Sequence, residues 1–254
     1  MSVSESVILV CAGADILLAA DSKHPLLELC MTIQHSDTLQ IQQSGIPCAY
    51  FGLRDPGRGC TQLAAESLAE QIVLLCQTQH LQGIFADLES NTPAVRHFCQ
   101  LLDTYLHTAD FTLFVPDTRA DDVQHAVITL QTAISGGSLA QRLTQAQQRF
   151  GSSRVAVLLE PVSADFCLPS QSPDGTPISR QEREQLLQDY HTQVFFSREL
   201  CAKYFTYMDA QERGHFVLFD DASTLDAKLA LLDQFQIRHR FAIYPDVAPL
   251  LKQS

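Results

Sequence analysis

The 254-residue chain contains no tryptophan, and basic residues are few, with 17 Lys and Arg against 29 Asp and Glu. The resulting net charge of −12 argues against the basic stripe that nucleic-acid binding requires, and it opposes docking on an anionic membrane. No run of about 18 uninterrupted apolar residues occurs, so the sequence predicts no membrane-spanning helix. We therefore expect neither a nucleic-acid partner nor a membrane partner.

The amino-terminal residues lack the basic segment of a signal peptide, and the apolar run Val7–Cys11 is too short for a signal core. On this basis we expect a cytoplasmic chain. The eight cysteines form no C-x-x-C pair, and most of them lie in apolar runs. This pattern favours reduced, buried thiols over disulfides or a zinc site. We expect no metal and no cofactor.

Several catalytic and nucleotide-binding motifs are missing as well. Neither G-x-G-x-x-G nor G-x-x-x-x-G-K-[ST] occurs, which removes support for a nucleotide-binding open sheet. The G-x-S-x-G turn of serine hydrolases is also absent, so a Ser/His/Asp hydrolase is not favoured.

Short apolar runs alternate with helical patterns along most of the chain, which is typical of a parallel sheet. The number of runs and the chain length fit one (β/α)8 TIM barrel, an α/β fold, better than an open sheet, and we expect a single domain over residues 1–254. The expected strands are Val7–Cys11, Cys48–Gly52, Gly83–Asp87, Phe111–Val115, Ala126–Leu130, Arg154–Leu159 and Phe241–Tyr244, with another near Cys30–Ile33. The expected helices are Gln62–Gln77, Pro93–His107, Leu139–Phe150, Arg180–Asp189 and Leu225–Gln234.

Residues 163–220 interrupt this alternation. They hold a polar loop, a helical stretch and two apolar runs, Tyr204–Tyr207 and Phe216–Phe219, with a polar turn between them. Such a pair of runs predicts a β-hairpin. We interpret the region as a small α+β insertion before the last barrel strand.

The most informative segment is Gly83–Glu89, an apolar strand that ends in two acids. Side chains of a strand alternate between its faces, so Phe85, Asp87 and Glu89 share one face. Two carboxylates at the end of a buried strand are electrostatically costly, which favours a role in chemistry. The bland alternative is an acidic strand end followed by the cap of a helix.

The segment Gln82–Glu89 resembles the D-G-x-D-x-D-x-E signature of family 18 glycoside hydrolases, the chitinase-like barrels. Two further segments, Tyr204–Asp209 and His215–Ala230, resemble the tail of the spore-cortex-lytic and germination branch of that family. The resemblance covers roughly residues 62–246, whereas the first sixty residues match poorly and look shortened.

The resemblance implies hydrolysis of a glycan that contains N-acetylglucosamine, chitin-like or peptidoglycan, by a retaining mechanism without an enzyme nucleophile. Glu89 is then the general acid/base. Asp87 orients the N-acetyl group of the substrate, which itself attacks the anomeric carbon. The partner that the resemblance implies is therefore a glycan.

The sequence also departs from the family pattern. Gln82 and Phe85 replace the first two acids of the signature, Gln131 aligns near the family's tyrosine, and Tyr244 aligns with the tryptophan that forms the floor of the sugar site. Other polar residues follow the strands and would give an acidic, hydrogen-bonding mouth. The candidate substrate-binding residues are Phe85, Gln131, Tyr244, Asp117 and Glu160.

Two other interpretations stay open. The lost acid, tyrosine and tryptophan favour a catalytically reduced barrel that binds a glycan or a protein partner. The second interpretation is an unrelated barrel enzyme that acts on a small polar metabolite. The retention of Glu89 together with Asp87 favours the hydrolase.

Overall fold

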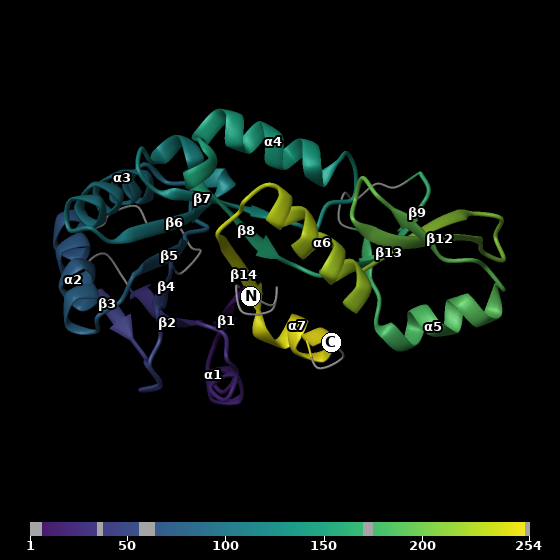
Figure 1. The fold of residues 1–254 in the computed structure, drawn as a ribbon, viewed down its shortest axis with the longest axis horizontal. Coiled ribbons are helices and arrows are strands. Elements are labelled where there is room, and N and C mark those ends of the chain that lie inside the picture. Colours follow the sequence, from purple (N-terminus) through teal and green to yellow (C-terminus); the bar gives the residue numbers. More distant parts are fainter. Residues whose placement is uncertain (1–6, 35–37, 56–63, 170–174, 252–254) are drawn as a thin grey trace. The chain divides into compact units, whose positions relative to one another are not determined.

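Eight strands close into a (β/α)8 barrel in the computed structural model, which describes residues 7–34, 38–55, 64–169 and 175–251 (Figure 1). Neighbours follow the order β1-β14-β8-β7-β6-β5-β4-β2, and the parallel pairing of β1 with β2 completes the ring. The expected barrel is confirmed. Its strands are β1 (Val7–Cys11), β2 (Leu26–Gln34), β4 (Tyr50–Arg54), β5 (Gly83–Asp87), β6 (Thr112–Pro116), β7 (Val127–Gln131), β8 (Val155–Leu159) and β14 (His239–Ile243).

The contacts of the chain divide it into two units. Unit 1 comprises residues 1–130, 147–158 and 237–245, and unit 2 comprises residues 131–146, 159–236 and 246–254. Each unit has hydrophobic clusters of its own. The expectation of a single domain stays a prediction.

The helices expected from the sequence are present, with small shifts at their ends. Pro93 begins α3 directly after Thr92, whose Oγ1 accepts a hydrogen bond from the backbone N–H of Val95 at 3.3 Å. The first two residues of the helix expected from Gln62 lie outside the described residues. The helices are α1 (Asp15–Ala19), α2 (Ala65–Thr78), α3 (Pro93–Thr108), α4 (Leu139–Phe150), α5 (Arg180–Asp189), α6 (Ala222–Gln234) and α7 (Tyr244–Leu251), and 3₁₀ helices cover Asp117–Asp122 and Ser152–Arg154.

Alternate residues of the barrel strands enter two different cores. On β5, Ile84 and Ala86 join an outer cluster with residues of α2 and α3, the helices that lie along this side of the barrel in Figure 1. Phe85 joins an inner cluster and packs against Phe241 with 5.2 Å between ring centroids. The alternation expected for Gly83–Asp87 is therefore confirmed.

Unit 2 carries a five-stranded sheet with the order β10-β9-β13-β12-β11. Its strands fall between β8 and β14 in the chain, where the sequence predicts an insertion, and β12 and β13 form the expected hairpin. The sheet packs on apolar side chains such as Phe205 and Val217. The strands are β9 (Ser163–Cys167), β10 (Thr176–Pro177), β11 (Phe195–Ser197), β12 (Ala202–Met208) and β13 (Gly214–Phe219).

Several elements differ from the expectation. The strand expected at Cys48–Gly52 runs two residues further, to Arg54, and Tyr244 begins α7 instead of ending a strand. Strands buried on both faces appear in a sequence as continuous apolar runs, whose ends carry no periodic signal. The elements without a sequence prediction are α1, α7, β3 (Thr38–Ile41), β9, β10 and β11.

A buried ion pair anchors α6 within unit 2. Lys228 Nζ lies 2.6 Å from Asp220 Oδ2, and each side chain is only 2% exposed. The same carboxylate accepts hydrogen bonds from Thr224 Oγ1 at 2.6 Å and from the backbone N–H of Val162 at 2.9 Å. Such a pair is costly to break, because the remaining charge stays buried without a counter-charge.

We expect Lys228→Met to lower the free energy of unfolding by about 3–5 kcal/mol, because Asp220 loses its buried cation. Chemical denaturation of the full chain measures this. Lys203→Met is the matched control, since Lys203 pairs with Asp221 in a partly exposed position and its loss costs at most about 1 kcal/mol. Equal destabilisation by the two substitutions would contradict the assignment.

Candidate active site at the carboxyl ends of the barrel strands

The loops that follow β4, β5 and β6 place acidic residues at one edge of the barrel. Asp55 follows β4, Glu89 lies two residues beyond β5, and Asp117 begins the 3₁₀ helix after β6. The three strands are parallel neighbours, so their carboxyl ends meet at the same edge. This is the end at which barrels of this type form active sites.

Two buried charged side chains hold the backbone around Glu89. Asp55, 9% exposed, accepts hydrogen bonds from the backbone N–H of Glu89 at 3.0 Å and of Ser90 at 2.9 Å. Arg119, 4% exposed, donates to the carbonyl oxygens of Leu88 and Ser90. Charge-assisted hydrogen bonds are roughly twice as strong as neutral ones. The loop is therefore fixed at its backbone while the Glu89 side chain stays exposed.

Asp87 ends β5, and its side chain is partly buried. The register of the parallel strands places it beside Arg54, the last residue of β4. Residues in register share a face, and this face is the barrel interior because Phe85, two residues earlier, belongs to the inner cluster. The opposite face, toward the helices, is taken by the fully buried Ala86.

Sequence reasoning missed Arg54, Asp55 and Arg119. The strand expected before them ended at Gly52, which placed Arg54 and Asp55 in an unassigned loop. The signal that could have found them is a charged pair directly after an apolar run, because polar residues at the carboxyl end of a barrel strand belong to the site. Arg119 lies in a polar stretch with no such signal.

The interior behind the acid pair is largely aromatic. The rings of Phe114 and Phe241 lie 4.9 Å apart between centroids, and Tyr50 and Phe85 complete the group. Phe85 is 8% exposed, so it serves the inner core. Its expected contribution to substrate stacking stays a prediction.

One buried hydroxyl faces this interior without a partner. Thr129 lies two residues after Val127, a member of the inner cluster, and therefore points to the same side of β7. Among the described residues, Thr129 Oγ1 has no hydrogen-bond partner although the residue is 4% exposed. A buried hydroxyl of this kind needs a water molecule or a ligand atom.

Tyr244 and Asp117 flank the same end of unit 1. Tyr244 follows β14, and its hydroxyl donates to the carbonyl oxygen of Leu18 at 3.2 Å. Asp117 is partly buried at the start of its 3₁₀ helix. The structure thus brings Asp87, Glu89 and Asp117 to one edge and gives the Tyr244 hydroxyl a backbone partner. Their roles in catalysis and substrate binding stay predictions.

Gln131 and Glu160 belong to unit 2. Gln131 is the exposed last residue of β7. Glu160 follows β8, and its backbone N–H donates to Thr132 Oγ1 at 3.1 Å. Burial raises the pKa of the Glu160 carboxyl, the charge of Asp246 raises it further, and Lys228 opposes the change. Glu160 therefore binds a proton more readily than an exposed glutamate.

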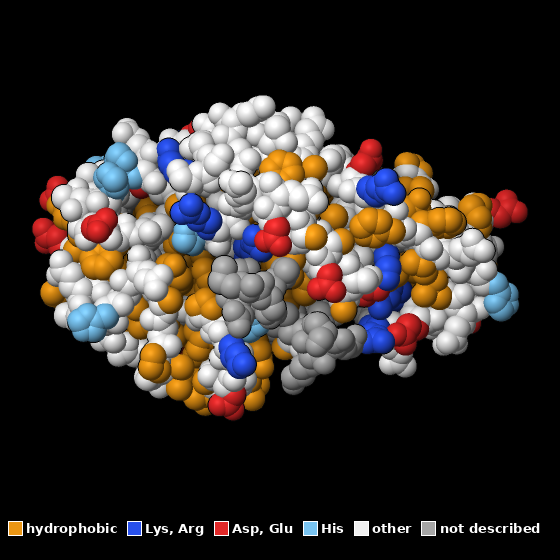
Figure 2. Space-filling view, viewed as in Figure 1, with side chains coloured by type: hydrophobic (Ala, Val, Ile, Leu, Met, Phe, Trp, Pro, Cys, Tyr) orange, Lys and Arg blue, Asp and Glu red, His pale blue; other side chains and the backbone are white. Residues whose placement is uncertain are grey.

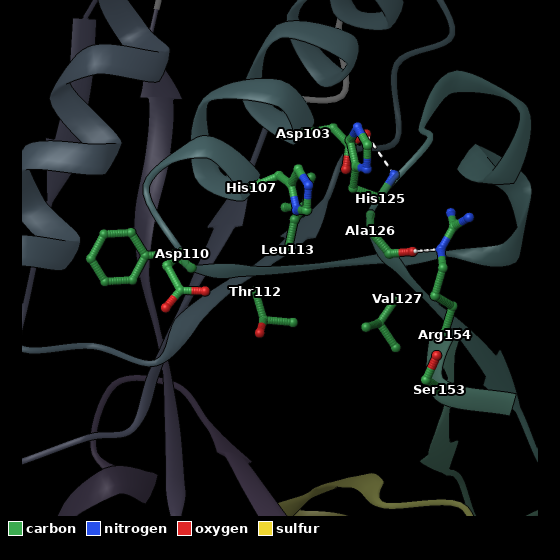
Figure 3. A pocket seen from close by; sticks show the side chains of 11 residues that line it. Asp103, His107, Asp110, Thr112, Leu113, His125, Ala126, Val127, Ser153 and Arg154 are labelled. Atoms are coloured by element: carbon green, nitrogen blue, oxygen red, sulfur yellow. Dashed lines mark hydrogen bonds between the residues drawn. The ribbon is translucent and has the colours of Figure 1, made fainter. Parts of the chain in front are cut away.

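A polar pocket of about 230 Å³ lies at the opposite, amino ends of β6, β7 and β8 in unit 1 (Figure 3). There Asp103, 2% exposed, accepts hydrogen bonds from the backbone N–H of Gln124 at 2.7 Å and of His125 at 2.9 Å. The His125 ring stacks on that of His107 with 3.9 Å between centroids. Polar groups at the amino end of a barrel are associated with stability, so we do not place the active site here.

Most of the described cysteines are buried like small apolar residues. Five of the cysteines that the structure describes are buried, and burial raises the pKa of their thiols, to about 12 for Cys76 and Cys99. Within residues 7–34, 38–55, 64–169 and 175–251, no group of three His, Cys, Asp or Glu side chains is arranged to hold a metal ion. In the same part of the chain, no helix has the length and apolarity to cross a membrane. The buried cysteines are Cys11, Cys30, Cys76, Cys99 and Cys201.

Comparison with solved structures finds the same barrel in several glycosidases. A chitinase from Chromobacterium violaceum is 14% identical with a TM-score of 0.66, covering 94% of this chain and 93% of its own. The spore cortex-lytic enzyme SleL from Bacillus megaterium is 18% identical with a TM-score of 0.63, covering 94% and 70%. A family 18 N-acetylglucosaminidase from Paenibacillus barengoltzii is 12% identical with a TM-score of 0.62, covering 98% of both chains.

No protein-family model and no curated protein sequence matches this chain. At identities of 12 to 18%, the structural likeness establishes a shared fold, and the chemistry has to be argued from the site. The fold that the resemblance to family 18 implies is confirmed.

We expect Asp55→Ala to release the loop that carries Glu89, because two backbone N–H groups lose a charged acceptor. Hydrogen exchange measured by mass spectrometry should show faster exchange in residues 83–92, and the free energy of unfolding should fall by about 2–3 kcal/mol. Asp21→Ala, at an exposed position, is the control. Unchanged exchange in residues 83–92 would show that Asp55 does not hold this loop.

Proposed function

We propose that the chain is a glycoside hydrolase of the family 18 type that acts on a glycan containing N-acetylglucosamine, chitin-like or peptidoglycan. The observation that carries the proposal is the acid pair at the carboxyl end of β5. Asp87 lies on the interior face, and the backbone of Glu89 is held by Asp55 and Arg119. The barrel shared with chitinases and a cortex-lytic enzyme supports it.

In this proposal Glu89 donates a proton to the glycosidic oxygen. Its exposed carboxyl reaches a bound sugar, and the fixed backbone on either side limits its range of positions. Positioning of this kind is a large part of catalytic power, since a misplaced group costs orders of magnitude in rate. Asp55 and Arg119 act through the backbone of Glu89, so they are positioning residues.

Asp87 accepts the N–H of the substrate's acetamido group. This contact turns the acetamido oxygen toward the anomeric carbon, where it attacks as the glycosidic bond breaks and the leaving oxygen takes the proton from Glu89. Water then opens the cyclic intermediate with Glu89 acting as base, so the anomeric configuration is retained. No cofactor enters this scheme.

The alternative is a catalytically reduced barrel that binds a glycan or a protein partner. It is favoured by Phe85, which takes the place of a signature acid and is packed into the inner aromatic cluster. Tyr244 is a second departure, because it aligns with the tryptophan on which the family stacks a sugar ring. Its hydroxyl already donates a hydrogen bond to the carbonyl oxygen of Leu18.

Hydrolysis of chitooligosaccharides and of cortex-type peptidoglycan tests the proposal. We expect Glu89→Gln to lower kcat about 10²- to 10⁴-fold, because the amide cannot donate the proton, with little change in binding. Reducing-sugar release and product chromatography measure the rate. Glu70→Gln, an exposed change on α2, is the matched control and should leave the rate unchanged.

Hydrolysis that survives Glu89→Gln would remove the role assigned to this residue. Absent hydrolysis with saturable glycan binding would support the reduced barrel. If the protein neither hydrolyses nor binds any of these glycans, both the hydrolase and the glycan-binding barrel are ruled out.

A further inference from the structure

A pocket of about 400 Å³ lies within unit 1, on the outer side of the barrel. It is lined from β2 by Glu28, from β4 by Phe51, and from the segments that precede β4 and β5. Phe51 belongs to the outer cluster, whereas its neighbour Tyr50 belongs to the inner one. The pocket is therefore separate from the acid pair at the carboxyl ends of the strands, and we call it the Glu28 pocket.

The Glu28 pocket lies where the helix layer of the barrel is incomplete. In a (β/α)8 barrel a helix normally follows each strand and covers its outer face. Here α1, between β1 and β2, has only five residues, and the described residues 38–49 between β2 and β4 contain no helix. Leu17, Leu18 and Ile41 are exposed, and hydrophobic side chains gather over this part of unit 1 in Figure 2.

The loop before β4 covers the outer face of β2 in place of a helix. The backbone N–H of Gln42 donates to the carbonyl oxygen of Cys30 at 2.8 Å. Further along the loop, the backbone N–H of Ser44 donates to Glu28 Oε1 at 2.7 Å, and that of Ile46 donates to Ser44 Oγ at 3.1 Å. The wall of the pocket is thus held in place, so a ligand does not have to order it.

The second carboxylate oxygen of Glu28 has no partner. Glu28 is 3% exposed, and its Oε2 forms no hydrogen bond with any described residue. It is the one acid among the described residues that line the pocket, and this lining holds no lysine or arginine. A buried carboxylate is costly unless a cation or hydrogen-bond donors compensate it. Oε2 therefore requires a donor that enters through the pocket.

The neighbouring thiol does not meet this requirement. Burial and the nearby charge of Glu28 raise the pKa of the Cys48 thiol to about 11, so the thiol is neutral. Its hydrogen is directed elsewhere, because Cys48 Sγ donates to the carbonyl oxygen of Ile46 at 3.3 Å. The negative charge of Glu28 is left without a counter-charge.

The arrangement favours an ammonium group over other cations. A guanidinium fork pairs with both oxygens of a carboxylate, but Oε1 of Glu28 is already engaged by Ser44. Magnesium and calcium need several oxygen ligands, and no group of three metal-binding side chains occurs in the described part of the chain. A compact ammonium can pair with the single free oxygen. The side chains of Phe51, Ile46 and Leu81 in the same lining suit an alkyl chain.

We propose that the Glu28 pocket binds an alkylammonium ion, with the ammonium paired to Glu28 Oε2 and the alkyl chain against Phe51 and Leu81. The amide oxygens of Gln43 and Gln79, which also line the pocket, can accept the remaining N–H bonds of the ammonium. The group that is recognised is the same in a free amine and in a lysine side chain. This site is independent of the proposed hydrolase activity.

Isothermal titration of the full chain at pH 8 with n-butylamine tests the proposal, because this amine is protonated at pH 8 as a lysine side chain is. n-Butylamine should bind at least about 10-fold more tightly than 1-butanol, which has the same chain without the charge, and than butylguanidine. Glu28→Gln should remove the preference over 1-butanol, since the amide keeps an acceptor for Ser44 but loses the charge. Glu66→Gln, an exposed change on α2, is the matched control and should leave binding unchanged.

Three results would overturn the proposal: no binding of n-butylamine, equal affinity for 1-butanol, or a preference that survives Glu28→Gln with an unchanged melting temperature. Butylguanidine binding as tightly as the amine, or Mg²⁺ displacing it at equal concentration, would overturn the choice of an ammonium. If Glu28→Gln does not fold, the comparison of n-butylamine with 1-butanol on the unaltered protein decides. Tighter binding of Nα-acetyl-lysine methylamide than of n-butylamine would support a lysine side chain as the source, and weaker binding would support a free amine.

Discussion

Closure of the barrel is the constraint on which the other features depend. It gives every strand one face toward a shared interior and one face toward the helices. On β5 this sends Phe85 into the aromatic interior and Ile84 into the outer core. Because side chains alternate with period 2, Asp87 takes the inner face where that interior opens at the carboxyl ends. The strand topology therefore determines at which end of the barrel the acid pair lies. The hydrogen bonds of the loop after β5 then fix the backbone of Glu89.

The same constraint explains which parts of the fold could be predicted from the sequence. The strand Gly83–Asp87 was predicted to the residue because a continuous apolar run lies between a glycine and an acid. The strand β2 was predicted only in part, because it contains Glu28, a buried polar residue that breaks the apolar run. Its Oε1 accepts a hydrogen bond from the backbone N–H of Ser44 at 2.7 Å, a contact that periodicity cannot reveal.

The candidate site also contains residues that the sequence could predict and residues that it could not. Asp87 and Glu89 belong to the first group, because their spacing along one strand is visible in the sequence. Asp55 and Arg119 do not, because their partners are backbone atoms of a loop 34 and 31 residues away. A backbone N–H or carbonyl has no sequence identity, so such contacts arise only once the fold has brought neighbouring strands together. Prediction from sequence therefore located the acids but not the groups that hold them.

The charge around Asp87 also differs from the pattern that the family signature implies. In that pattern an inward acid lies two residues before it, whereas here the inner position is filled by Phe85 and the neighbour in register is Arg54. Asp87 therefore has the cationic Arg54 beside it at the carboxyl end of the strands, and no acid below it in the barrel interior. On the proposed function, Asp87 would serve as a fixed acceptor for the acetamido N–H, and Glu89 alone would carry the proton. Orientation of the substrate and transfer of the proton would then depend on two different side chains. The apolar interior beside Asp87 supplies no third acid for either step.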